Sequence, residues 1–195
     1  MSVTIRPAAE SDLPAISTLL GESFAEIDSL AALVGGDPAQ RLGRMFGMWT
    51  KEFYLPHGYV DVAENQGRIA GVALWAYPKK HMSLIDDIRL LPTYVRVLRW
   101  RLIPAARREF ITGSYHPKEA HWYLFAIGVA GAGQGKGTGS ALLEHGLARV
   151  GDSTAYLEAA NSRAARLYQR FGFVPMGPIP GPKGFEPEIA MVRYP

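Results

Sequence analysis

The sequence predicts a fold of the α+β (mixed α/β) class, in which a central mixed β-sheet is flanked by helices. Two observations carry this prediction. Residues 122–129 form a nearly continuous apolar run, WYLFAIGV, as expected for a strand covered on both faces. Segments with strand and helix patterns alternate after it. With 195 residues and 48% hydrophobic content, the chain is expected to form a single domain, residues 1–195, around a full core.

The first part of the chain is expected to contain a strand at 3–6, helices at 13–24 and 38–54, strands at 59–63 and 69–77, and a helical stretch at 84–111. Ser11 to Pro14 supplies capping residues and an early proline for the first helix, and Asp37-Pro38 opens the second. Asn65 to Arg68 has the composition of a hairpin turn. Pro92 and Pro104 are expected to break the long helical stretch.

The second part is expected to contain the strand at 122–129, a helix reaching Val150, a strand at 155–159, a helix at 164–171, and final strands near 173 and at 186–193. Leu142, Leu143, Gly146 and Val150 recur on one helical face, so the glycine-rich stretch before them lies at that helix's N-terminus. Gly172 is expected to end the following helix.

Composition excludes several classes of chemistry. The chain has no cysteine, which removes disulfides, thiolate metal ligands and a cysteine nucleophile, and which fits the cytoplasm. The N-terminus shows no basic segment followed by an apolar run, and no stretch reaches 18 uncharged apolar residues. We therefore expect a cytoplasmic protein that neither enters nor binds a membrane.

The net charge of +3 and the pI near 9.2 favour anionic ligands only weakly. We expect no nucleic-acid partner, because the chain lacks a dense basic stripe. The densest basic stretch is interpreted as the solvated face of helical segments. Its members are Arg89, Arg96, Arg99, Arg101, Arg107 and Arg108.

The stretch VAGAGQGKGTGS, residues 129–140, contains enough glycine to bind a phosphate group. A P-loop requires a glycine where Ala130 stands and a hydroxyl where Gly137 stands, so that reading fails. A dinucleotide-binding GxGxxG fails in every register. The pattern that fits is QxxGxG, from Gln134 to Gly139, between an apolar strand and a helix. The same letters are also compatible with a flexible surface loop.

Two motifs in the right order resolve this choice. QGKGTG at 134–139 is followed by LE at 157–158 and by NSRAARLYQRFGF at 161–173. Together, these segments resemble the GNAT superfamily of N-acetyltransferases over residues 121–173. Within it, HPKEAHWYLFAIGV, QGKG and YLEAANSRAARLYQRFGF are most similar to the actinobacterial branch that includes puromycin N-acetyltransferase. The similarity becomes weaker before residue 115.

The resemblance implies the GNAT acyl-CoA N-acyltransferase fold and direct transfer of acetyl from acetyl-CoA to a primary amine, without a metal ion. It places the pantetheine arm along a strand and the pyrophosphate on the glycine-rich stretch. Glycines there would let the phosphates approach backbone N–H groups at a helix N-terminus, and Gly128 would let the arm lie close. The implied binding residues are Ile127, Gly128, Val129, Gln134, Gly135, Lys136, Gly137, Thr138, Gly139, Ser140, Asn161 and Tyr168.

Tyr168 matches the family's tyrosine that protonates the departing thiolate, although its spacing also suits packing with Leu167 and Phe171. The attacking amine must lose a proton, which at pH 7 costs about 4 kcal/mol for an amine of ordinary pKa. Glu158 is the candidate base, acting directly or through water, and the alternative interpretation is a surface or salt-bridged carboxylate. Glu188 and His121 are reserve candidates, and for His121 a structural hydrogen-bonding role is favoured.

The acceptor pocket is expected to be walled by Phe24, the helices of residues 38–54, Trp75 and Tyr77, and closed by bulky residues between 75 and 115. The leading hypothesis is a small-molecule amine acceptor. The alternatives are a protein or peptide N-acetyltransferase and a non-catalytic acyl-CoA-binding sensor. We expect a monomer or a homodimer.

Overall fold

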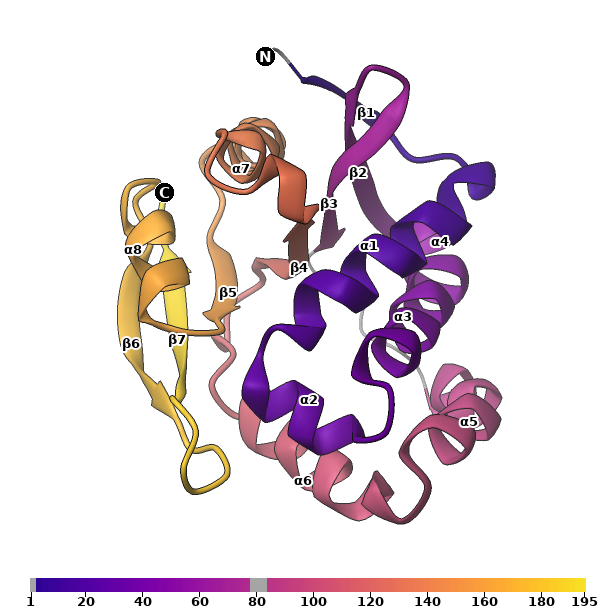
Figure 1. Ribbon diagram of the computed structural model, residues 1–195. Helices are drawn as coiled ribbons and strands as arrows, with labels where there is room; N and C mark the ends of the chain where they lie inside the picture. Colours follow the sequence, from indigo (N-terminus) through magenta and orange to yellow (C-terminus); the bar gives the residue numbers. More distant parts are fainter. Residues whose placement is uncertain (1–2, 78–83) are drawn as a thin grey trace.

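The computed structural model describes residues 3–77 and 84–195, and Figure 1 shows the described elements. Its strands form one seven-stranded sheet in the order β1-β2-β3-β4-β5-β7-β6. β4 and β5 pair in parallel, and the other neighbouring strands pair antiparallel, so the predicted mixed sheet is confirmed. The strands are β1 (Thr4–Pro7), β2 (Gly58–Asn65), β3 (Arg68–Ala76), β4 (Trp122–Val129), β5 (Ala155–Ala159), β6 (Val174–Ile179) and β7 (Glu188–Arg193).

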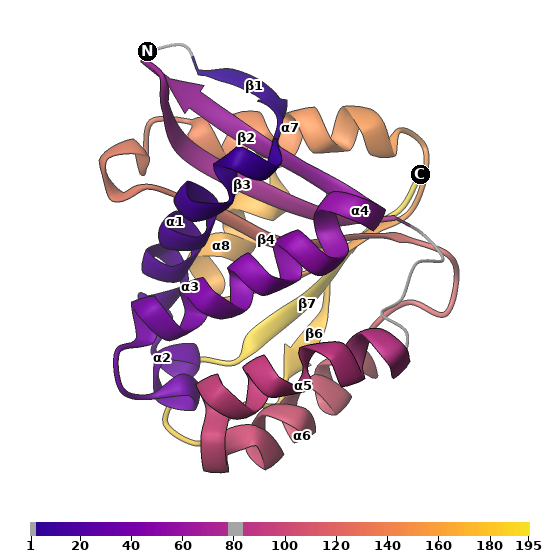
Figure 2. The same ribbon diagram turned by 90° about the vertical axis from the view of Figure 1, so that its right-hand side faces the viewer.

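Helices cover both faces of the sheet, which confirms the predicted arrangement. In Figure 2, α1 and α3 lie in front of the strands β2 to β4, and α7 lies behind them. α8 packs against β5 and β7. The helices are α1 (Leu13–Ala25), α2 (Asp28–Val34), α3 (Pro38–Trp49), α4 (Leu55–His57), α5 (Leu84–Leu98), α6 (Leu102–Gly113), α7 (Thr138–Val150) and α8 (Ser162–Gln169).

Three details of the helices differ from the sequence prediction. Helix α2 was not predicted, and residues 50–54 form a π-helical turn between α3 and α4. Pro92 lies inside α5 and does not end it. The break falls instead at a 3-10 turn that begins at Arg99, whose φ of 53° is left-handed. Pro104 lies in the first turn of α6, where its missing N–H removes no helical hydrogen bond.

β4 is covered on both faces, as its apolar run predicts, but its alternate residues from Tyr123 to Val129 are only half-buried. Phe125 is an extra residue in the pairing with β3, because Leu74 pairs with Ala126 and Trp75 pairs with Leu124. Such a bulge changes which face the following side chains occupy.

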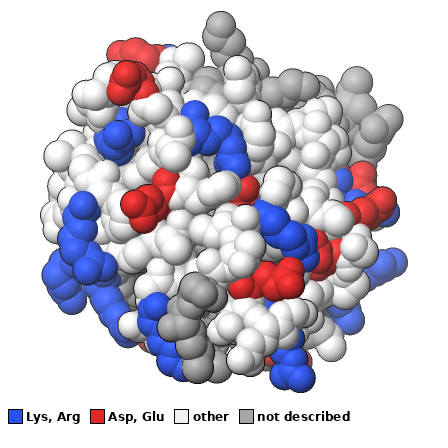
Figure 3. Space-filling model, turned by 90° about the horizontal axis from the view of Figure 1, so that it is seen from above, with Lys and Arg blue, Asp and Glu red and all other residues white. Residues whose placement is uncertain are grey.

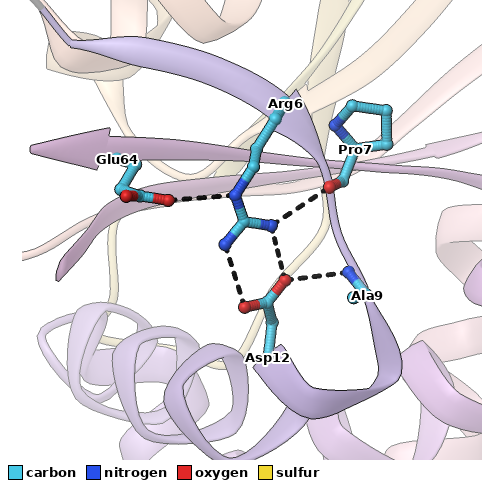
Figure 4. A network of polar contacts seen from close by, with 5 residues as sticks. All are labelled: Arg6, Pro7, Ala9, Asp12 and Glu64. Carbon is cyan, nitrogen blue, oxygen red and sulfur yellow. Dashed lines mark hydrogen bonds and ion pairs between the residues drawn. The ribbon is translucent and has the colours of Figure 1, made fainter. Parts of the chain in front are cut away.

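The first strand is tied to the rest of the protein by a charged network, shown in Figure 4. Arg6 on β1 donates hydrogen bonds to both carboxylate oxygens of Asp12, at 2.7 and 3.1 Å, and to Glu64 on β2 at 2.9 Å. Asp12 also accepts a hydrogen bond from the Ala9 N–H at 2.8 Å. These bonds, led by that of Arg6, lower the pKa of the Asp12 carboxyl.

The charged surface agrees only in part with the interpretation of the basic stretch. Arg96, Arg99 and Arg107 are exposed, as expected. Arg101 and Arg108 instead bond within the protein, Arg101 to carbonyl oxygens at the end of α2 and Arg108 to Glu188. The side chain of Arg89 lies outside the described residues. On the face seen in Figure 3, positive and negative side chains are interspersed.

Within residues 3–77 and 84–195, no helix combines the length and the apolar character that a membrane span requires.

Candidate active site

The candidate site lies where β4 and β5 separate. The two strands pair only from Trp122 to Leu124 on β4, although β4 continues to Val129. A cavity of about 120 Å³ opens beside the unpaired part. Ligands of open sheets commonly bind at the carboxyl ends of parallel strands, and both strands end here. The cavity is lined by Ser23, Phe24, Ile27, Leu124, Phe125, Ala126, Ile127, Glu158, Ala160, Ala164 and Tyr168.

Glu158, near the end of β5, places its carboxylate at this cavity with only 10% of its side chain exposed. Oε2 accepts a hydrogen bond from the Tyr123 hydroxyl at 2.7 Å. Oε1 lies 3.2 Å from Nε2 of His116, and it is buried without an aligned hydrogen bond from the described residues. Glu158 is therefore not a surface carboxylate, whereas the other alternative, a salt-bridged carboxylate, agrees with its contact with His116. Glu158 is a buried acceptor group on the wall of a cavity.

Tyr168 reaches the same cavity from α8. The residue is 7% exposed, and its ring packs edge-on against Phe173. Burial, and next the charge of Glu158, raise the pKa of the phenol well above its usual value. The hydroxyl therefore stays protonated at neutral and moderately alkaline pH, which is the state a proton donor requires. The structure therefore shows both features expected of Tyr168, namely packing in the core and a position at the cavity.

Sequence reasoning missed three residues around Glu158: Tyr123, Tyr156 and His116. Burial, followed by the charge of Glu158, raises the pKa of both tyrosines. The tyrosines stand on β4 and β5 and read as ordinary strand residues, while His116 precedes β4 in a loop. No local sequence signal marks these residues, because Tyr123 and Tyr156 come together only through the pairing of β4 with β5.

The glycine-rich stretch lies directly before α7, as predicted, with a 3-10 turn at Gly131–Gly133. Gly137 is the N-cap of α7 and has a φ of 85°, a conformation that favours glycine. A Cβ on Gly131, Gly135 or Gly137 would meet no atom within 4 Å, so the backbone there is open to a ligand. Lys136 is exposed beside it.

The first helical hydrogen bond of α7 runs from the Ala141 N–H to the Gly137 carbonyl. The N–H groups of Thr138, Gly139 and Ser140 precede it and point out of the helix end. Together with the positive end of the helix dipole, they suit a pyrophosphate. The residues present therefore fit the phosphate end of coenzyme A.

Other predicted binding residues are placed as follows. Ile127 lines the cavity, and Val129 lies at the end of β4. Gln134 is exposed, and its amide donates to Glu26 at 3.3 Å. Asn161 is the N-cap of α8, and its side-chain oxygen accepts from the Ala164 N–H at 2.9 Å.

The packing of α1 against β4 requires a glycine at position 128. A Cβ at this position would lie 2.8 Å from Cδ2 of Leu20 and 3.2 Å from Cδ2 of Leu19. Helix α1 therefore occupies the space in front of Gly128, and a side chain there would push the helix away from the sheet.

The prediction of the residues that form the pocket wall is correct only in part. Phe24 lines the cavity, and residues of the 38–54 helices lie behind it, because Trp49 and Tyr54 pack against Phe125. Trp75 is 0% exposed and packs against Gly146 of α7, so its assignment to the pocket is wrong.

Tyr77 is half exposed, packs against Trp122 and is absent from the cavity lining. Residues 78–83, part of the stretch expected to close the pocket, lie outside the described residues.

The reserve bases are engaged elsewhere. Glu188 is held by Arg108. His121 bonds to the Glu119 carbonyl and to His116, so the expected hydrogen-bonding role of His121 is confirmed. The described residues contain no group of three or more His, Cys, Asp or Glu side chains that could hold a metal ion.

Comparison with known proteins identifies the family. Residues 103–175 match the model of an acetyltransferase (GNAT) domain. A crystal structure from Corynebacterium glutamicum, described as histone acetyltransferase HPA2 and related acetyltransferase, is 36% identical. The alignment covers 100% of this chain and 97% of that one, with a TM-score of 0.80. The chain belongs to the GNAT acetyltransferase family.

More distant GNAT structures share the fold. Polyamine N-acetyltransferase from Drosophila melanogaster is 18% identical, with a TM-score of 0.59 and full coverage of both chains. Arylalkylamine N-acetyltransferase 2 from Aedes aegypti is 14% identical, with a TM-score of 0.67 and coverage of 100% of this chain and 99% of that one. GNAT acetyltransferases use acetyl-CoA as their cosubstrate.

Proposed function

We propose that this protein is an acetyl-CoA-dependent N-acetyltransferase that transfers acetyl directly to a primary amine of a small molecule. The observation that carries the proposal is the cavity between β4 and β5, which has a carboxylate and a protonated phenol on its walls. One group can accept a proton and the other can donate one, as acyl transfer from a thioester to an amine requires.

Glu158 acts as the base. An amine enters as an ammonium ion, and a buried carboxylate attracts it and accepts its proton. The Tyr123 hydrogen bond fixes the carboxylate through Oε2, and the proton reaches the buried Oε1 directly or through water. The neutral amine then attacks the acetyl carbon.

Tyr168 acts as the acid. As the carbon–sulfur bond of the tetrahedral intermediate breaks, the thiolate takes the phenolic proton, and the second proton that the nitrogen loses on becoming an amide restores the phenol. The position of Tyr168 on the cavity wall supports catalysis over the alternative of a non-catalytic acyl-CoA sensor.

Acetyl-CoA binds along the separated edge of β4, with backbone groups of Ile127, Gly128 and Val129 serving the pantetheine amides. The phosphates bind at Gln134–Ser140. The side-chain oxygen of Asn161 already caps α8, so its amide nitrogen is the group that donates a hydrogen bond to acetyl-CoA.

The acceptor is assigned to small amines because the cavity is small, about 120 Å³, and its lining includes the aromatic residues Phe24, Phe125 and Tyr168. Fold neighbours named for polyamines and arylalkylamines support this class. The resemblance to the puromycin N-acetyltransferase branch makes aminonucleosides the first compounds to test. A peptide acceptor is the second candidate, favoured by the Corynebacterium structure described as histone acetyltransferase HPA2 and related acetyltransferase.

The proposal is tested by assaying thiol release from acetyl-CoA with polyamines, arylalkylamines, aminonucleosides and histone-like peptides. At least one small amine should be acetylated well above every peptide. Glu158→Gln should flatten the alkaline-rising limb of the pH profile, whereas Glu144→Gln, at an exposed position on α7, should not. Peptide turnover without small-amine turnover would overturn the acceptor assignment.

We also propose the domain organisation, oligomeric state and location of the enzyme. Residues 1–195 act as a single domain, as a monomer or homodimer in the cytoplasm, without a nucleic-acid or membrane partner.

A further inference from the structure

Acetylation of an amine releases a proton that must leave a buried site. An ammonium substrate and a thioester become an amide, a thiol and one free proton. Glu158 receives that proton while only 10% of its side chain is exposed. We propose that His116 and His121 form a path that carries the proton from Glu158 to the protein surface. This inference rests on the proposed function, because it assumes that Glu158 is the base.

The distances form an unbroken chain. Nε2 of His116 lies 3.2 Å from Oε1 of Glu158. Nδ1 of His116 lies 3.1 Å from Nε2 of His121, and Nδ1 of His121 lies 2.7 Å from the Glu119 carbonyl oxygen. The side chain of His116 is 24% exposed, against 10% for Glu158, and His121 is also half-buried.

The contacts determine where each neutral ring carries its hydrogen. A carbonyl oxygen can only accept, so Nδ1 of His121 carries the hydrogen and its Nε2 is an acceptor. Nδ1 of His116 must then donate to that Nε2. Nε2 of His116 is consequently left with a lone pair, directed to the Glu158 side of the path.

This arrangement leaves a place for a proton between His116 and Glu158. The buried Tyr156 hydroxyl also acts on Glu158 but makes no aligned hydrogen bond with the described residues. Nε2 of His116 and Oε1 of Glu158 are then both acceptors 3.2 Å apart, and Oε1 lacks an aligned hydrogen bond from the described residues. A buried acceptor without a partner is costly. A proton that Glu158 removes from the substrate supplies the missing hydrogen between the two groups.

The proton moves from Glu158 to water in successive transfers. Oε1 of Glu158 gives the substrate's proton to Nε2 of His116, and Nδ1 of His116 gives its own proton to Nε2 of His121. The His121 ring is then an imidazolium and releases one proton to water. Glu158 is again a carboxylate, and reorientation of the part-exposed rings restores the starting tautomers. One proton enters and one leaves, with no change of oxidation state.

Aromatic rings hold the path in place. His116 contacts the rings of Tyr156 and Tyr123 at centroid distances of 4.4 and 4.7 Å, and His121 contacts Tyr156 at 5.7 Å. Other titratable or charged groups that act on this polar centre are Tyr54, Glu109, Tyr115, Tyr168 and the Arg108–Glu188 pair. His116 and His121 act through Glu158, so they are positioning residues.

The first test is independent of enzymatic activity. Nitrogen-15 NMR of the histidine rings in the wild-type protein near neutral pH should show both rings as the tautomer with hydrogen on Nδ1. His121→Phe, which has no acceptor atom, should remove the hydrogen-bond signature at Nδ1 of His116. Hydrogen on Nε2 of either neutral ring would overturn the proposal, whether or not an acceptor amine has been found.

The second test uses turnover of a small amine. His116→Gln and His121→Gln should each lower kcat with little change in KM, by up to about 10²-fold, the lower end of general-base effects. The double variant should be no slower than the slower single variant, because groups that act in series are not additive. Added imidazole should restore part of the rate and alter its pH profile.

His145→Gln on α7 is the control and should leave kcat, KM and the pH profile unchanged. Multiplicative losses in the double variant, or no response to imidazole, would overturn the relay. Loss of activity in Glu158→Gln with normal pH profiles in both histidine variants would remove the relay and keep the proposed function. An inactive wild type would instead contradict the proposed function, and the NMR result would still decide the histidine geometry.

Discussion

A carboxylate at Gly137 should abolish binding of coenzyme A while leaving the fold intact. A Cβ at this position meets no atom within 4 Å, so Gly137→Asp introduces no collision. The φ of 85° adds strain of about 1 kcal/mol for a residue with a side chain. For a chain of this length, that strain lowers the melting temperature by about 2–4 °C.

The effect on ligand binding should be larger. Coenzyme A at about 100 times its Kd stabilises the folded protein by about 2.7 kcal/mol, or about 5–11 °C in melting temperature. Two like charges about 4 Å apart near a protein surface repel by about 4 kcal/mol. Repulsion of that size weakens phosphate binding by more than about 10²-fold, and the thermal shift should fall below about 2 °C.

Differential scanning fluorimetry with and without coenzyme A measures both effects. Gly184→Asp is the matched control, because Gly184 has a φ of 90° and equally open space. It belongs to the β6–β7 loop, which Figures 1 and 2 show far from the start of α7. The control should retain the full shift. A full shift in Gly137→Asp, or a wild-type shift with NAD or ATP and none with coenzyme A, would refute the assignment of the loop.

Three further predictions concern catalysis, packing and pH. Tyr168→Phe should lower kcat by about 10²-fold or more with little change in acetyl-CoA affinity, and unchanged steady-state turnover would leave Tyr168 a packing role only. Because burial and the charge of Glu158 raise the pKa of that phenol, wild-type activity should show no loss from its ionisation near pH 10. Gly146→Ala should destabilise the protein by about 1–3 kcal/mol in urea unfolding, because the new Cβ would lie 2.4 Å from Nε1 of the buried Trp75; an unchanged midpoint would contradict this packing. Asp12→Asn should cost about 1 kcal/mol at neutral pH through the bonds to Arg6 and Ala9. The pKa of Asp12 is depressed in the folded state, so this contribution exists above the ordinary value of 3.8 and disappears as pH falls through the folded value. The wild type and the variant should therefore converge in acid, and a gap independent of pH would contradict the ion pair.

The sequence by itself determined the local structure of the segment to which we assign acetyl-CoA binding. The apolar run of β4, the glycine-rich stretch and the helix after it are neighbours in the chain, so their arrangement follows from local rules of strand burial and helix capping. Tyr168 and Glu158 could be named in advance for the same reason, since both lie within a short segment around β5 and α8.

Only the tertiary structure decided which groups surround Glu158. Tyr123 and Tyr156 meet because β4 and β5 pair in parallel across an intervening helix, and no local pattern records that pairing. His116 joins them from a loop, at a distance set by packing on the two tyrosine rings. Trp75 lies in the core because Gly146, on a helix 71 positions later in the sequence, leaves room for its indole. Contacts between residues so far apart depend on how whole elements pack, which side-chain spacing within one segment does not specify.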